Sequence, residues 1–142
     1  MDSSEKQLPR EILKRADLRS NELAWHPSDI PDVIEAARRV SLISLGGDLQ
    51  VRAPSGLWGE PVRVGFSVEV AEDLPWVEQV EQTAQTSLSD FLALQERLDF
   101  EAIARESFPN LVAEVAQAKD VIFFSWIMAD EEHAIRLRRG LL

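Results

Sequence analysis

The fold is decided by residues 41–71, which have the sequence SLISLGGDLQVRAPSGLWGEPVRVGFSVEVA. In the first part of this stretch the odd positions are apolar, and in the second part the parity is reversed. The apolar positions are Ile43, Leu45, Leu49 and Val51, followed by Val62, Val64, Phe66, Val68 and Val70. Successive side chains of a strand point to opposite faces, so each part is predicted to be a strand with one buried and one exposed face. Together they indicate a long antiparallel hairpin over residues 41–71.

Gly46 and Gly47 interrupt the first of these strands. Glycine inside a strand commonly marks a bulge, a bend or the close approach of another backbone. The alternation continues in phase across the pair, which favours a bend over a one-residue bulge. A phosphate-binding loop is the alternative, but it needs more glycines at set spacing and a helix after them, whereas a strand follows here.

The loop between the two strands, residues 54–61, is longer than a tight turn requires and carries Leu57 and Trp58 between two glycines. Aromatic residues on loops are candidates for partner recognition, so Trp58 is a candidate binding residue. The alternative is that Trp58 folds back over the sheet and covers the core. Trp25, in a connector predicted at residues 21–27, is a second candidate for contact with a partner.

The other segments show helical periodicity and one further strand. Helices are predicted at residues 9–19, 28–40, 74–98, 99–108, 110–119 and 130–139, with Asp99 and Asp130 as N-caps. Residues 74–98 fit one kinked helix or two shorter ones equally well. Residues 121–128, VIFFSWIM, are apolar on both strand faces except at Ser125, which predicts a central strand covered on both sides. Residues 1–8 are expected to be a flexible tail of a single α+β domain with a small, mainly antiparallel sheet.

The charge of the chain is unevenly distributed. The formal net charge is −10, and residues 71–135 hold fourteen acids against three bases, a balance of −11. Glu78 and Glu81 lie off the apolar stripe of the helix predicted at 74–98, so they are candidate binding residues. A phosphate backbone or an anionic membrane needs a basic footprint, which disfavours nucleic acid and membranes as partners. A basic protein is the favoured partner, and the alternative is an acidic surface that only maintains solubility.

Residues for catalysis or metal binding do not form a recognisable motif. The chain has no cysteine, and its two histidines, His26 and His133, lie in segments that give no reason for them to meet. Asp130 and His133 could share a metal, but two ligands do not make a site, and Asp130 is better explained as an N-cap. No catalytic residue, metal ligand or cofactor is therefore predicted. The absence of cysteine and of an apolar leader is typical of a cytoplasmic protein.

In general character the chain resembles bacterial proteins that neutralise or escort another protein, such as immunity proteins to secreted toxins or secretion chaperones. The resemblance implies a non-enzymatic module that binds a basic protein, and it assigns a role to no particular residue. The alternative is a small-molecule-binding domain or an enzyme with a pocket between hairpin and helices, for which His26 and His133 are the candidate polar groups. A homodimer that pairs through the hairpin edge is also possible.

Overall fold

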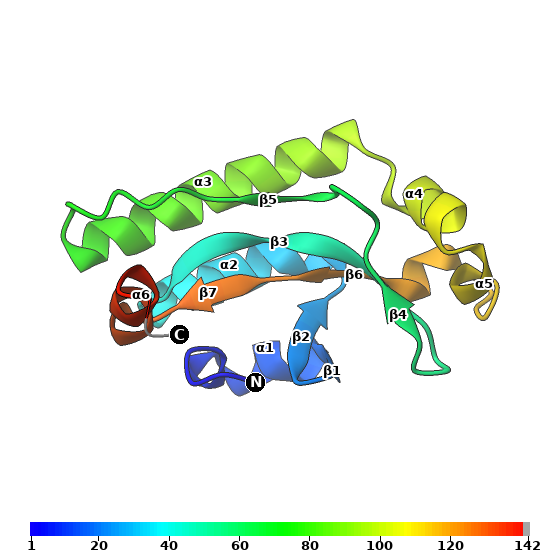
Figure 1. Cartoon of the computed structure of the whole chain (residues 1–142), viewed down its shortest axis with the longest axis horizontal. Coiled ribbons are helices and arrows are strands. Elements are labelled where there is room, and N and C mark those ends of the chain that lie inside the picture. Colours follow the sequence, from blue (N-terminus) through cyan, green and yellow to red (C-terminus); the bar gives the residue numbers. More distant parts are fainter. Residues whose placement is uncertain (141–142) are drawn as a thin grey trace.

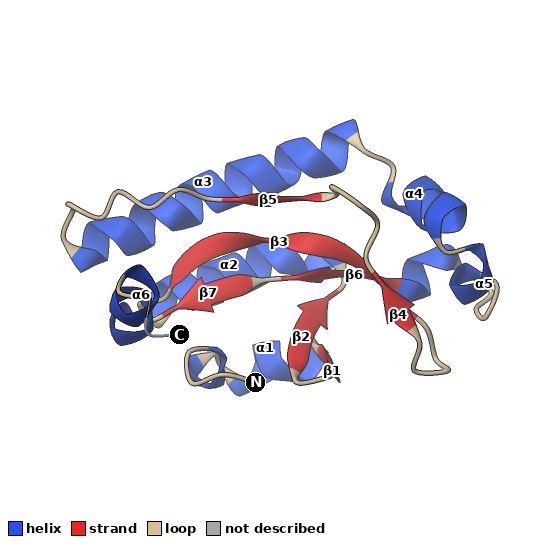
Figure 2. Ribbon diagram, in the orientation of Figure 1, coloured by secondary structure: helices blue, strands red, loops and turns tan. Residues whose placement is uncertain are grey.

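The computed structural model describes residues 1–140 and shows a single α+β domain built around an antiparallel sheet, as the sequence predicts (Figures 1 and 2). The sheet follows the order β1-β2-β6-β3-β4, and β5 and β7 pair with β3 beside this path. Its strands are β1 (Asp17–Arg19), β2 (Glu22–Trp25), β3 (Ile43–Arg52), β4 (Trp58–Gly59), β5 (Gly65–Ser67), β6 (Ile122–Ser125) and β7 (Ile127–Ala129).

Strand β3 is the central strand, with a neighbour on each side. Residues 49–51 pair with β6 and residues 43–46 with β7, while β4 and β5 pair with β3 from the other side. The prediction of a half-exposed hairpin arm was therefore wrong in one respect. Gln50 and Arg52 were expected on an exposed face, and both are buried.

The second arm of the predicted hairpin is not a continuous strand. Only β4 and β5 pair with β3, and the chain between them turns at Arg63, whose φ of 62° lies in the left-handed region. This conformation breaks the alternation of faces at the start of the arm. Val62, expected in the core, is 84% exposed, whereas Val64 and Val68 are buried as predicted.

The glycine pair forms a bulge, which corrects the expected bend. Ser44 pairs with Met128 and Gly46 with Ile127, so Leu45 is an extra residue opposite β7. Gly46 has a φ of 105°, a conformation that favours glycine, and a Cβ atom there would clash with the carbonyl oxygen of Phe66. A strand follows the pair, and nothing in its geometry favours a phosphate loop.

The predicted strand at 121–128 is divided into β6 and β7 at Trp126, which is buried. Strand β6 lies between β2 and β3 and is buried over its length, which confirms a central strand. Ile127 in β7 is 52% exposed, however, so the expected cover on both faces does not extend to β7.

The N-terminal region is more ordered in structure than the sequence predicted. The helix expected at 9–19 is only α1 (Arg10–Arg15), and the predicted connector contributes a hairpin of β1 and β2. Its turn residues Ser20 and Asn21 both have positive φ, as two-residue hairpin turns require. Residues 1–8, expected to be a flexible tail, are packed against the domain, with Ser4 and Leu8 buried around the 3₁₀ helix η1 (Glu5–Gln7).

The remaining helices follow the sequence pattern closely at their starts. They are η2 (Pro27–Asp29), α2 (Ile30–Arg39), α3 (Trp76–Arg97), α4 (Phe100–Ser107), α5 (Pro109–Val112), η3 (Ala118–Val121) and α6 (Glu131–Arg138). Helix α3 is one helix, which decides between the two alternatives. The N-caps predicted at Asp99 and Asp130 are confirmed, because Asp99 accepts a hydrogen bond from the Ala102 N–H and Asp130 from the His133 N–H. The helix expected at 110–119 was wrong, since α5 ends at Val112.

The hydrophobic core lies between the sheet and helices α2 and α3. Leu49 and Val51 of β3 and Phe124 of β6 belong to one buried cluster with Val33 of α2 and Phe91 of α3. In the view of Figure 1 no helix lies in front of the central part of β3. The sheet therefore has one face packed on helices. The other face has no helix over the centre of β3, and we call it the open face.

Candidate functional site

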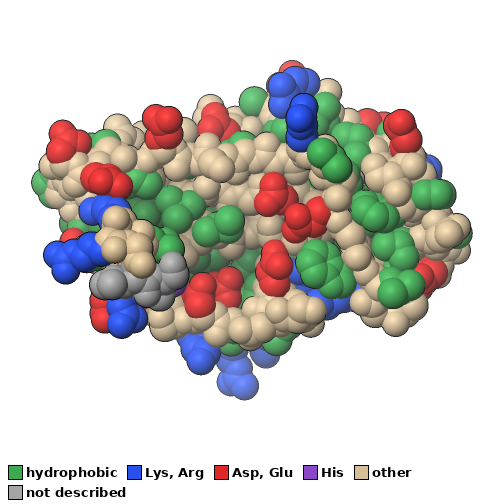
Figure 3. Space-filling model, viewed as in Figure 1, with side chains coloured by type: hydrophobic (Ala, Val, Ile, Leu, Met, Phe, Trp, Pro, Cys, Tyr) green, Lys and Arg blue, Asp and Glu red, His purple; other side chains and the backbone are tan. Residues whose placement is uncertain are grey.

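The open face of the sheet carries the polar side chains of β3. Since Leu49 and Val51 point into the core, Asp48, Gln50 and Arg52 point to the opposite side. In the same view, Figure 3 shows carboxylates gathered over the middle of the molecule. This concentration of polar groups around a central strand marks the face as a candidate site.

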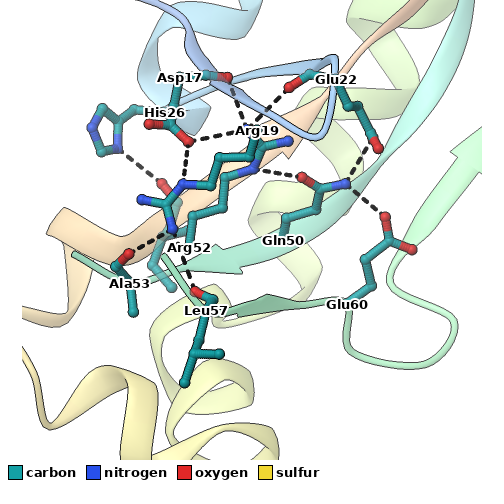
Figure 4. A network of polar contacts seen from close by, with 10 residues as sticks. Asp17, Arg19, Glu22, His26, Gln50, Arg52, Ala53, Leu57 and Glu60 are labelled. Atoms are coloured by element: carbon teal, nitrogen blue, oxygen red, sulfur yellow. Dashed lines mark hydrogen bonds and ion pairs between the residues drawn. The ribbon is translucent and has the colours of Figure 1, made fainter. Parts of the chain in front are cut away.

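Arg52 is the buried centre of a polar network (Figure 4). Its side chain is 0% exposed, and its Nε donates to the Gln50 side-chain oxygen at 2.8 Å. Its Nη1 lies 3.0 Å from the Asp17 carboxylate and also donates to the carbonyl oxygens of Asp17 and Glu22, at 2.8 and 3.2 Å. The Trp58 ring covers the guanidinium, whose carbon lies 5.6 Å from the ring centroid. Its Nη2 is buried and has no hydrogen-bond partner among residues 1–140.

Gln50 connects this buried arginine to two carboxylates. Its Nε2 donates to Glu22 Oε1 at 2.9 Å and to Glu60 Oε1 at 2.6 Å. Because its oxygen accepts from Arg52, the orientation of the amide is fixed. Glu22 and Glu60 are thereby held beside each other at the surface end of the network by a neutral group.

Asp48 and Glu5 complete a set of four acids that we name the sheet-face acidic cluster: Glu5, Glu22, Asp48 and Glu60. Burial raises the pKa of Asp48, and the charges of Glu60 and Glu22 raise it further. Burial also raises the pKa of Glu5, followed by the charge of Asp2, and Glu22 adds to the effect. None of the four makes an ion pair with any residue that the structure describes. The cluster is therefore a concentration of negative charge without a direct ion pair within residues 1–140, although the N-terminal ammonium partly offsets the raised pKa of Glu5.

The residues expected to contact a partner do not lie together. Trp58 lies on the open face, half-buried over Arg52. The prediction that Trp25 contacts a partner is wrong. Trp25 is fully buried in the core, and its indole N–H donates to the Ile12 carbonyl at 2.9 Å. Glu78 is exposed and Glu81 is half-exposed near the start of α3, at the opposite end of the molecule from β4 (Figure 1).

Sequence reasoning missed most of the acidic cluster. Asp48 was placed on the polar face of its strand, but Glu5 was assigned to the tail and Glu22 to a connector. The available signal was the alternation Asp48, Gln50, Arg52, because a polar stripe with an arginine and an amide needs partners if it is covered.

A cavity of about 600 Å³ lies elsewhere, where β6 begins, between η2, η3 and the junction of α3 and α4. His26 lines this cavity, its Nδ1 lies 2.9 Å from the Ile122 carbonyl, and its ring stacks on Phe123 at 4.3 Å. His133 is on α6 and does not line it. A smaller cavity of about 310 Å³, between β5 and α3, is the one that lies between the hairpin region and a helix.

Comparison with protein families, with curated proteins and with solved structures found no match to this chain. Within the described part of the chain, no group of three or more acidic or histidine side chains is placed to hold a metal ion. Of the helices in residues 1–140, none has the length and apolar character needed to cross a membrane.

Proposed function

We propose that this protein is a non-enzymatic binding module that engages a basic protein partner through its sheet-face acidic cluster. The observation that carries the proposal is the absence, within residues 1–140, of any cation paired with Glu5, Glu22, Asp48 or Glu60. Burial and the charges of neighbouring acids make the charged form of Glu5 and Asp48 costly in the isolated chain. An arginine or lysine of a partner would remove that cost on binding, which favours a complex of opposite charges.

The position of Trp58 favours the same surface as the region that contacts the partner. It is half-buried, lies on the open face and is two residues from Glu60. Aromatic side chains are enriched at the centre of protein interfaces, and polar groups surround them at the rim. The partner would therefore place a basic side chain against the carboxylates and an apolar or planar group against the exposed part of the indole.

An acidic module of this kind would act as an immunity protein, an antitoxin or a chaperone acts, by covering a basic region of another protein in the cytoplasm. Charge complementarity supports this choice over nucleic acid or an anionic membrane, which would be repelled by the same cluster.

The experiment is affinity capture from the native cells with the wild-type chain and two matched double variants. Glu22→Gln with Glu60→Gln removes two charges of the cluster and keeps the side-chain size. Glu78→Gln with Glu81→Gln removes two charges from α3. We expect one protein with a basic surface to be retained by the wild type and the α3 variant, to be lost from the cluster variant, and to be released by salt.

Equal capture by the cluster variant would contradict the proposal, and so would a partner that stays bound in high salt. Circular dichroism of each variant is the control that separates lost binding from lost folding.

A further inference from the structure

The cavity beside His26 has features of a small-molecule site that the proposed partner surface does not use. We name it the His26 pocket. Its volume of about 600 Å³ lies within the range of roughly 300–1,000 Å³ that ligand sites occupy. Leu98, Phe100 and Ile122 supply apolar wall, and polar groups from three separate elements converge on the same space.

His26 lines this pocket and makes a hydrogen bond that determines its tautomer. Its Nδ1 lies 2.9 Å from the Ile122 carbonyl oxygen. A carbonyl oxygen can only accept, so Nδ1 carries a proton, and in the neutral form of the ring this tautomer leaves the lone pair on Nε2. Stacking on Phe123, with an interplanar angle of 27°, fixes the plane of the ring. Nε2 is thus a positioned acceptor, held by a hydrogen bond that determines the tautomer.

The charged groups around the pocket favour a donor or a cation over an anion. Asp99, Glu101 and Asp120 line it, against the single base Lys119. Asp99 already caps α4 through the Ala102 N–H, so the first turn of that helix does not offer all its donors to an anion. Glu101, Lys119 and Asp120 make no side-chain hydrogen bond or ion pair that the structure records within residues 1–140, which leaves them available.

From these features we infer that the His26 pocket binds a flat heteroaromatic ligand that carries N–H donors, such as an amino-substituted or amidine-bearing ring. The ring would lie against the apolar wall formed by Leu98, Phe100 and Ile122. One N–H would donate to His26 Nε2, and a second, or a positive charge, would be received by Asp120. This inference does not depend on the proposed protein partner.

The test uses 2-aminobenzimidazole as the probe, titrated into the full chain by calorimetry. We expect saturable binding of one molecule per chain. The ring signals of His26 in an NMR spectrum should shift on titration while those of His133 stay in place. Benzothiazole, a ring system of similar size without N–H donors, should bind at least tenfold more weakly.

Two variants and a control locate the site. His26→Phe keeps a ring to stack on Phe123 but removes the acceptor, and it should weaken binding at least tenfold. Asp120→Asn, at an exposed position that does not endanger folding, should weaken binding about threefold to tenfold. His133→Phe is the matched control and should leave the affinity within twofold.

The inference is overturned if 2-aminobenzimidazole shows no saturable binding at millimolar concentration. It is equally overturned if the probe shifts His133 in place of His26, or if Asp120→Asn and His26→Phe both bind it as the wild type does.

Discussion

The sheet-face acidic cluster and the surface formed by α2 and α3 carry the same kind of side chain in opposite electrostatic states. On α2 and α3, Arg38 lies 2.6 Å from Glu35 and 2.9 Å from Glu81. Hydrogen bonding to Arg38 lowers the pKa of Glu35 to about 2. In the cluster no cation of residues 1–140 forms an ion pair, and the pKa values of Glu5 and Asp48 are raised. The difference shows that the position of the arginines, more than the number of acids, decides where negative potential is left for a partner.

Replacing the arginine beneath the cluster should give the largest effect in either region. Arg52→Ala removes one of the two arginines that bind the Asp17 carboxylate, the other being Arg19. It also leaves the Gln50 oxygen and the carbonyl oxygens of Asp17 and Glu22 without this buried donor, so we expect a loss of about 3–5 kcal/mol in the free energy of unfolding. Arg39, whose side chain is 73% exposed and pairs with Glu35, is the control. Arg39→Ala should cost less than about 1 kcal/mol. Urea denaturation measures both, and similar losses would show that burial does not distinguish the two regions.

The elements of the sheet were predictable where their apolar alternation was long. The alternation over residues 43–52 predicted the strand and placed Asp48, Gln50 and Arg52 on one face. What the pattern could not show was that this face is partly covered, because its cover comes from β1 and β2. Those strands have three and four residues, too few for periodicity to be detected.

The acidic cluster could not be predicted because its members come from four separate segments. Glu5 lies in η1, Glu22 in β2, Asp48 in β3 and Glu60 after β4. The pairing of β2 with β6 and of β6 with β3 brings Glu22 near Asp48, and the pairing of β3 with β4 brings Glu60 there. The sequence does carry an excess of acids at 71–135, but arginines from outside this range neutralise part of it in the folded protein. Arg38 pairs with Glu81, and Arg138 lies 3.2 Å from Glu72.

Trp58 gives the next largest expected effect, on binding. Trp58→Ala should raise the dissociation rate of the captured partner about thirtyfold, since loss of a central aromatic contact costs about 2 kcal/mol. Trp76, which is half-buried at the start of α3 and donates to the Ser41 carbonyl, is the matched tryptophan outside the cluster. Trp76→Ala should leave the dissociation rate within about twofold. Surface plasmon resonance measures both rates, and equal effects would remove the distinction between the two surfaces.

Charge reversal in the acidic cluster should slow association with the partner more than charge reversal on α3. Glu60→Lys places a cation beside Glu22 and Asp48 and should slow association about fivefold at low salt, because it weakens electrostatic attraction. Glu78→Lys changes the charge by the same amount on exposed α3 and should slow association less than twofold. If Glu78→Lys slows it as much as Glu60→Lys, the α3 surface expected from the sequence contributes equally, and only the total charge matters.

The smallest expected effect is on the pH dependence of stability, and its sign differs between the regions. A carboxyl group whose pKa is raised on folding binds its proton more tightly in the native state, so stability falls as the pH rises above the ordinary value, 3.8 for Asp48. Asp48→Asn should therefore stabilise the protein at pH 7 by less than about 1 kcal/mol, since the group is partly exposed and solvent screens its charge.

Glu35 behaves in the opposite way: its pKa is lowered from 4.5 to about 2, so its contribution to stability is present above pH 4.5 and is lost as the pH falls toward 2. Glu35→Gln should reduce stability at pH 7 and flatten the acid limb. Thermal unfolding between pH 2 and pH 8 measures both slopes, and two variants that shift stability at pH 7 in the same direction would contradict the contrast between a paired and an unpaired acidic surface.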